Sequence, residues 1–457
     1  MLDSTIYEVP VAPSSLEERT MRRVTRHIIP FLMILFIVNF LDRTNVAIAA
    51  LGMNRDIGIS QSVYGFGAGI FFLGYLLFEI PSNILLHRFG ARIWIARIMI
   101  TWGLVAAGMG FLQTTTHFVV MRTLLGIAEA GFFPGVVFLL SLWIPNRYRA
   151  KALAGFYLGL PIAQVIGAPL SAGLMKLGDS LGFSGWRVMY VCEGLPAILL
   201  GVGCLFYLTD TPSQARWLSD DERNWLIDTL AAERQNRTLT TDLQLSKRKQ
   251  IRRVLGNKSV WTLSLLYFGL TSGSNTMNFF LPTVLESFRG TFGLNIGLLQ
   301  NGLITAVPYA AAGVAMYFWS RHSDRHRERR KHAGSAALLA AFSIAFSFLT
   351  NNPFVIMLGF TLLAVGVYSA INVFWAIPGQ VLTGVEAATG IALINSIGNL
   401  SGFVGPFISG RLYSLTGTYT LSFLVIAVLV GFGGTGLLLF PKRYLEGSAA
   451  PLRRDVV

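Results

Sequence analysis

Two opposite charges lie within one apolar stretch of the chain, residues 118–144, which is long enough to cross a bilayer as a helix of roughly 20 residues. Arg122 and Glu129 are separated by seven positions in this stretch. Seven residues are close to two helical turns, so both side chains should project from one face, about 10 Å apart along the axis. Charges at membrane depth are costly, and they usually mark the path of a substrate or an ion.

A second charged pair, Asp42 and Arg43, lies in the first apolar stretch. An arginine stays charged and offers a planar fork that matches a carboxylate. A buried carboxyl group can gain or lose a proton when its surroundings change. The four residues therefore suit an organic anion held by the arginines and a proton carried by the acids. The alternative is that each charge only pairs with a neighbouring helix.

The composition is that of a membrane protein. Of 457 residues, 53% are hydrophobic and 13% are charged, whereas soluble proteins carry about 25% charged residues. The net charge of +14 does not require nucleic acid as a partner, because cations gather in loops on one side of a membrane. Cys192 and Cys204 are too far apart on a helix to form a disulfide with each other.

The hydropathy pattern predicts an all-α membrane protein in which twelve helices form two six-helix bundles. The expected spans are 27–50, 61–86, 93–112, 117–144, 149–175, 187–208, 259–285, 296–319, 333–350, 353–378, 386–410 and 418–440. The two termini and the connecting segments that share their side of the membrane hold 29 of the 37 Lys and Arg residues. Both termini and the central loop are therefore expected in the cytoplasm.

These spans define five regions: a cytoplasmic segment 1–26, a bundle 27–208, a loop 209–258, a second bundle 259–441 and a cytoplasmic tail 442–457. Ser15 and Glu18 have capping-box spacing, which predicts a short helix before the first span. Ser219 and Glu222 have the same spacing and predict an amphipathic helix in the loop. The basic cluster 247–253 indicates contact with anionic lipid.

The two halves of the chain repeat weakly. Short basic links follow the second and eighth spans, at 83–95 and 320–330. The fifth and eleventh spans carry matching Gly and Pro interruptions, in IGAPLSAGL (166–174) and VGPFISGRL (404–412). Such interruptions in corresponding spans are typical of secondary transporters, although small residues also allow close helix packing.

This arrangement resembles the major facilitator superfamily. In that superfamily the two basic links form cytoplasmic gate contacts, which the resemblance assigns here to Arg88 and Arg92 and to Asp324 and Arg325. The first link departs from the usual G-x-x-x-D-R-x-G-R-R pattern because His87 occupies the position of the acid. The resemblance therefore leaves the charge latch of that link in doubt.

Four motifs resemble the anion:cation symporter family within that superfamily: 40–60, 74–92, 122–135 (RTLLGIAEAGFFPG) and 185–197 (GWRVMYVCEGLPA). Its members take up organic anions with a cation, usually protons. The chain is most similar to bacterial carriers for tartrate, sugar acids, and 4-hydroxyphenylacetate or phthalate. The resemblance implies that the first and fourth spans line the central cavity and that Asp42 and Glu129 carry protons.

A coupling hypothesis follows. Ionised Glu129 neutralises Arg122, and its protonation releases the arginine for the substrate carboxylate. The second half offers amides and an aromatic wall rather than charges away from the ends of its spans. The further candidate substrate ligands are Tyr75, Gln164, Asn275, Asn278, Trp375 and Asn395. The resemblance favours Asn395, whereas helix–helix hydrogen bonding is the alternative for any single Asn.

We therefore expect a monomeric proton symporter for a small organic anion in a bacterial inner membrane, in contact with lipid and without a cofactor. The six histidines lie at span ends or in loops, so no metal cluster is expected within the membrane. Glu79, Arg97 and Glu193 are interpreted as structural. An aromatic acid as substrate, coupling to sodium, a membrane enzyme and a ligand sensor that does not transport are the alternatives.

Overall fold

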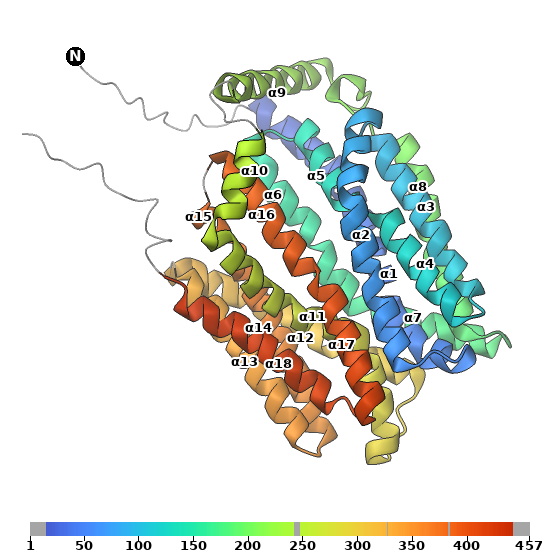
Figure 1. Ribbon diagram of the computed structural model, residues 1–457. Coiled ribbons are helices and arrows are strands. Elements are labelled where there is room, and N and C mark those ends of the chain that lie inside the picture. Colours follow the sequence, from blue (N-terminus) through green and yellow to red (C-terminus); the bar gives the residue numbers. More distant parts are fainter. Residues whose placement is uncertain (1–14, 242–246, 327, 383, 442–457) are drawn as a thin grey trace, which may run out of the picture.

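The computed structural model describes residues 15–241, 247–326, 328–382 and 384–441, and these residues are almost entirely helical (Figure 1). The first half of the chain forms α1 (Ser15–Asp56), α2 (Gln61–Phe89), α3 (Ala91–Gly108), α4 (Thr115–Glu129), α5 (Phe132–Trp143), α6 (Asn146–Tyr157), α7 (Gly159–Ser180) and α8 (Gly185–Tyr207). The connection contains α9 (Asp220–Thr241) and α10 (Lys247–Gly256). The second half forms α11 (Lys258–Phe292), α12 (Leu298–His326), α13 (Arg329–Leu349), α14 (Pro353–Phe374), α15 (Pro378–Val381), α16 (Gly384–Asn399), α17 (Ser401–Thr416) and α18 (Thr420–Leu439).

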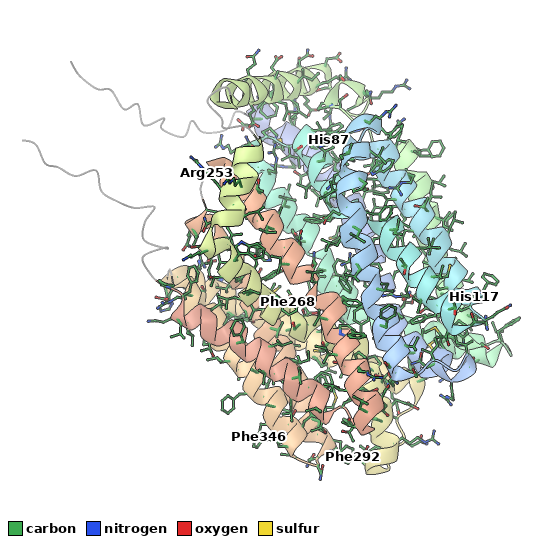
Figure 2. All side chains as sticks on the ribbon, viewed as in Figure 1. His87, His117, Arg253, Phe268, Phe292 and Phe346 are labelled. Atoms are coloured by element: carbon green, nitrogen blue, oxygen red, sulfur yellow. The ribbon has the colours of Figure 1, made fainter. Side chains whose placement is uncertain are left out.

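Eleven helical segments of the described chain are long and apolar enough to cross a membrane. Helix α11 is not among them although it has 35 residues, because Ser272, Asn275 and Asn278 lower the apolar content of its middle. Large apolar side chains cover the outside of the molecule; Phe346 on α13, for example, is 61% exposed and points outward (Figure 2). A helix begins at Ser15 as predicted, but the prediction that it is short is wrong, because α1 runs unbroken from Ser15 through the first span.

The predicted fourth span is two helices, and the break between them directly follows Glu129. Gly131 has a φ of 89°, which side chains other than glycine rarely adopt, and a Cβ there would lie 2.2 Å from the Ser82 Oγ atom. The Ser82 hydroxyl donates to the Ala130 carbonyl at 2.6 Å. The end of α4 is therefore held against α2, and Glu129 occupies the last turn of its helix.

The two halves contact each other toward the end away from α9. A Cβ on Gly65 of α2 would lie 2.3 Å from the Pro406 carbonyl oxygen of α17, and one on Gly302 of α12 would lie 2.7 Å from the Ala168 carbonyl oxygen of α7. Toward the α9 end of α2, Leu77 is 70% exposed. The glycines thus allow backbone-to-backbone contact between the halves at one end.

Helix α9 docks on the start of α1 through one carboxylate. The predicted capping box is confirmed, because the Ser219 backbone N–H donates to Glu222 Oε2 at 3.1 Å. The Glu222 side chain is 1% exposed and also accepts from Arg23 at 2.6 Å and pairs with Arg19 at 3.2 Å. Burial acts to raise the pKa of Glu222, but hydrogen bonds from Ser219 and the charge of Arg23 outweigh it and hold that pKa below its usual value.

Adding side-chain atoms at the contact between the halves should hold that end apart. In Gly65→Leu and Gly302→Val we expect overpacking to cost about 1–3 kcal/mol of stability. We also expect a longer distance between spin labels placed at the start of α2 and at the end of α17, the ends that lie away from α9. Gly173→Ala is the matched control, because nothing lies within 4 Å of a Cβ there. Unchanged label distances in both variants would contradict this contact.

Removing the charge of Glu222 should release α9. A carboxyl whose pKa is lowered in the folded protein contributes stability that is present above its ordinary pKa of 4.5 and is lost as pH falls through the folded value. We expect faster amide hydrogen exchange in α9 of Glu222→Gln at pH 7, and similar exchange in wild type only in acid. The control is Asp220→Asn, whose carboxylate is 85% exposed and pairs with Arg223 within α9.

Candidate functional site

The centre of the candidate site is an ion pair between α1 and the end of α4. Arg43 Nε donates to Glu129 Oε1 at 2.9 Å, and a terminal nitrogen of the same guanidinium donates to the same oxygen. Glu129 is 1% exposed, whereas the Arg43 side chain is 26% exposed. The other carboxylate oxygen, Glu129 Oε2, is buried and has no hydrogen-bond partner among the described residues. One partner of the pair is therefore accessible, and the other has an oxygen free to take a proton.

Aromatic rings surround this guanidinium. The Arg43 Cζ atom lies 4.9 Å from the ring centroid of Phe40, 5.4 Å from that of Phe71 and 5.5 Å from that of Tyr75. Such contacts favour a cation over the ring face. Tyr75, one of the predicted substrate ligands, thus lies beside Arg43.

Arg122 is not paired with Glu129, and the predicted salt bridge between them is wrong for this conformation. Its side chain is 1% exposed, and it donates to the backbone carbonyls of Gly67 and Ala68 at 3.2 Å each. The reason is distance along the helix: two turns separate Arg122 from Glu129, and the close approach of α2 supplies carbonyls at the level of the arginine. In this conformation Arg122 is covered, and its role as a substrate ligand stays a prediction.

Arg122 also lies where the two halves meet. Its Cζ atom is 5.0 Å from the Phe71 ring of α2 and 6.0 Å from the Phe279 ring of α11. Nearby, the Tyr64 hydroxyl donates to the Phe279 carbonyl at 2.8 Å. Phe71 contacts both Arg43 and Arg122, so it connects the accessible cation with the covered one.

Asp42 faces away from Arg43 and belongs to a separate polar group. The Asn45 side-chain amide donates to Asp42 Oδ1 at 2.8 Å and to Glu193 Oε2 of α8 at 2.8 Å, and the Ser171 hydroxyl of α7 donates to Glu193 Oε1 at 2.7 Å. Asp42 is 2% exposed and Glu193 is 4% exposed. No described Lys or Arg forms an ion pair with either acid, so two carboxyl groups share one amide without a cation.

Three of the predicted amide ligands, Gln164, Asn275 and Asn278, form hydrogen bonds with neighbouring side chains. Gln164 of α7 donates to the Tyr368 hydroxyl of α14 at 3.4 Å, and Asn278 Oδ1 accepts from Tyr368 at 3.3 Å and from Tyr309 of α12 at 2.7 Å. This chain of hydrogen bonds joins the first half to the second. Asn275 donates to the Ser401 hydroxyl at 2.9 Å, a helix–helix contact between α11 and α17.

The other two predicted ligands of this half differ in their surroundings. Trp375 directly follows α14 and packs edge-on against Tyr267, with ring centroids 4.8 Å apart. Asn395 of α16 is half-buried, and no hydrogen bond of its side chain is found among the described residues. Asn395 therefore differs from Asn275, whose amide nitrogen donates to Ser401, and from Asn278, whose amide oxygen accepts from two tyrosines.

The predicted gate residues do not contact one another across the halves. Asp324 pairs with Arg329, within the second half. The Arg92 backbone N–H donates to the Asp210 carboxylate at 2.9 Å, while exposed Arg88 lies over the Phe89 ring at 5.6 Å. Asp210, from the central connection, thus provides an acid at the first link, where the sequence has His87.

Sequence reasoning missed part of this site. Residue types alone favour a structural role for Glu193 and do not single out Tyr309 or Tyr368. Asn45 and Glu193 have the signal of polar residues within apolar spans, but their pairing depends on how α1, α7 and α8 pack.

The sequence profile of the Major Facilitator Superfamily matches residues 32–406 and 293–455. The chain is 44% identical to a "Putative tartrate transporter" of Agrobacterium vitis, over 96% of this chain and 99% of that protein. It is 37% identical to a "Quinolone resistance transporter" of Acinetobacter baumannii, over 91% and 94%. The crystal structure of a bacterial homologue of the human lysosomal transporter Spinster, inward-facing and unoccupied, has a TM-score of 0.75 at 16% identity, over 94% and 99%.

Proposed function

Because the chain belongs to the major facilitator superfamily and is a multi-pass membrane protein, we propose that it imports a small organic anion by proton symport through alternating access. The proposed substrate is a carboxylate such as tartrate or a sugar acid, in keeping with the name of its relative. We propose that the protein is a monomer with twelve spans and that both of its termini lie in the cytoplasm. We place it in the inner membrane of a bacterium.

The Arg43–Glu129 pair carries this proposal. Removing one charge from a buried ion pair leaves the other uncompensated, which costs several kcal/mol. When Glu129 takes up a proton on its free oxygen, Arg43 loses its counter-ion and a substrate carboxylate can replace it. The coupling hypothesis is thus kept, with Arg43 rather than Arg122 as the arginine that is exchanged.

The position of the contacts between the two halves supports alternating access. Their backbone contacts at Gly65 and Gly302 lie toward the end away from α9, and the predicted gate residues on the opposite side form no contact across the halves among the described residues. With the proposed topology, this conformation is closed outside and faces the cytoplasm. Gly65→Leu and Gly302→Val, which should hold these contacts apart, therefore also test whether closing this end is a step of the transport cycle.

The acids of α1 and α8 support coupling to protons. Two adjacent anions in a buried site repel each other, and Asp42 and Glu193 share the Asn45 amide without a cation. One proton between them removes that repulsion. We therefore assign coupling to Glu129, which controls substrate binding, and to the Asp42–Glu193 pair, which holds a proton apart from the substrate.

An aromatic acid of the 4-hydroxyphenylacetate or phthalate type is the second candidate substrate. The rings of Phe40, Phe71 and Tyr75 around Arg43 favour it, because an aromatic carboxylate could stack on them while its anion binds the guanidinium. A non-transporting sensor would bind the same ligands. Uptake into vesicles separates the sensor from the carrier.

Arg43→Gln should weaken anion binding. Charge-assisted hydrogen bonds contribute about 1.5–3 kcal/mol each, so we expect the affinity for tartrate, or for whichever acid the wild type binds, to fall by about 10- to 100-fold. Thermal shift with tartrate, a sugar acid and 4-hydroxyphenylacetate measures binding, and labelled uptake measures transport. The control is Arg55→Gln, at an exposed position of the same helix. Full affinity in Arg43→Gln would exclude Arg43 as the anion ligand.

Glu193→Gln should keep substrate exchange but lose the coupling of transport to protons. With Arg43 intact, the variant should still exchange labelled for unlabelled substrate across a vesicle membrane. We expect it to lose most accumulation driven by a pH gradient, because the Asp42–Glu193 pair can no longer exchange a proton. Glu286→Gln on α11 serves as the control. If Glu193→Gln accumulates substrate as wild type does, the acid is structural.

A further inference from the structure

The turn from α12 to α13 brings three histidines together. His322 and His326 are one turn apart on α12, and His332 is in the first turn of α13. Each offers a ring nitrogen, and these nitrogens all lie within 4.8 Å of one another. The sequence placed these histidines at span ends and predicted no metal site; the helical turn that gathers them follows from the packing of α12 against α13.

Backbone carbonyls orient two of the three rings. His326 Nδ1 lies 2.9 Å from the His322 carbonyl oxygen, and His332 Nδ1 lies 2.5 Å from the Glu328 carbonyl oxygen. A carbonyl accepts only, so each Nδ1 carries the hydrogen and each Nε2 keeps its lone pair. Histidine ligands of metals are held in this way by a hydrogen bond from the other ring nitrogen.

The third ring contacts the second directly. His322 Nδ1 lies 2.7 Å from His332 Nε2, which is a hydrogen-bond distance, so in this conformation the His332 lone pair faces the His322 ring and an ion would have to replace that hydrogen bond. Three nitrogen ligands around one ion, each about 2.0–2.1 Å from it, leave a fourth position open. A shift of the exposed His322 ring would open the present spacing enough to admit an ion.

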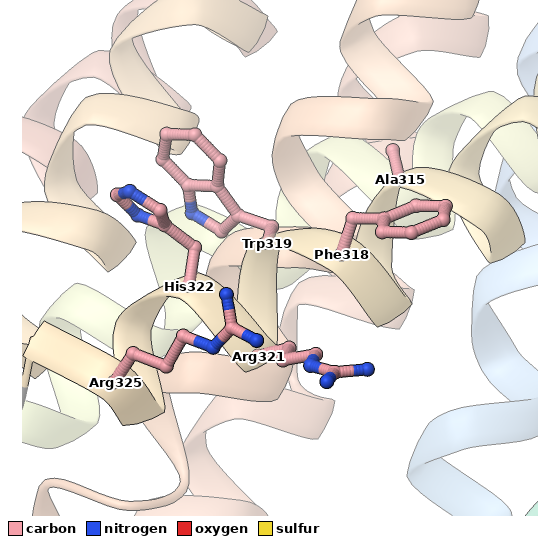
Figure 3. Close-up of a pocket in the computed structure, with 6 residues that line it drawn as sticks. All are labelled: Ala315, Phe318, Trp319, Arg321, His322 and Arg325. Atoms are coloured by element: carbon pink, nitrogen blue, oxygen red, sulfur yellow. The ribbon is translucent and has the colours of Figure 1, made fainter.

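A cavity of about 610 Å³ lies beside His322. His322 lines it next to Trp319, and Arg321 and Arg325 are further lining residues (Figure 3). The positive charges of these arginines repel a bare divalent cation, but they attract an anionic fourth ligand of the metal, such as hydroxide or a carboxylate. The Asp324 carboxylate, paired with Arg329, also lies on this turn.

We propose that His322, His326 and His332 bind one Zn²⁺ ion, or a similar imidazole-preferring divalent metal, and so link α12 to α13. Imidazole ligands suit Zn²⁺, Co²⁺, Ni²⁺ and Cu²⁺ and do not suit Mg²⁺. Because both helices belong to the second half, the ion fixes a turn rather than the contact between halves. Its binding does not depend on the identity of the transported anion.

The test uses the full-length protein, purified through a tag without histidines. Calorimetry with Zn²⁺ and visible absorption of bound Co²⁺ should give one saturable site, and Mg²⁺ should not compete. His326→Gln and His332→Ala should each weaken binding by more than about 100-fold, because even partners outside the coordination sphere matter by about 10- to 100-fold. His117→Ala is the matched control, an exposed histidine at the other end of the molecule (Figure 2).

Size-exclusion chromatography of each variant confirms folding, and His326→Gln changes an exposed side chain that a folded protein tolerates. Saturable binding that His117→Ala retains and both other variants lose would establish the site. Absence of a saturable site in wild type, or equal affinity in His326→Gln, would overturn it. Substrate uptake by His326→Gln in metal-free buffer should equal that of wild type.

Discussion

An arginine within a membrane must be neutralised, and the Arg43–Glu129 pair shows how this molecule does it. Glu129 reaches Arg43 from the last turn of α4, which ends where Gly131 has a positive φ and packs on Ser82 of α2. The packing on α2 therefore holds the end of the helix that carries Glu129. Arg43, its partner on α1, remains partly accessible.

The second cation is neutralised in another way. Arg122 has two backbone carbonyls and the rings of Phe71 and Phe279 instead of an acid. Dipoles and ring faces compensate a buried charge less completely than a carboxylate does. This position at the contact between the halves makes Arg122 sensitive to their movement, because separating the halves would remove Phe279 and expose the guanidinium.

Much of the candidate site could be predicted from residue types alone. Charged residues in apolar spans are rare enough that Asp42, Arg43, Arg122 and Glu129 stand out in the sequence. Which of them pair could not be read from spacing, because spacing constrains residues of one helix and the partners lie on different helices. The same limit explains Glu193, whose carboxyl is joined to Asp42 only through Asn45.

The sequence by itself determined the class of the protein, the helical spans apart from their breaks, and the residue types available for anion and proton binding, since hydropathy and charge act along the chain. Only the tertiary structure decided that Glu129 neutralises Arg43, that Arg122 is covered by α2, and that three histidines meet at the turn after α12. These depend on helix packing, where a shift of one turn, about 5.4 Å, exchanges one partner for another.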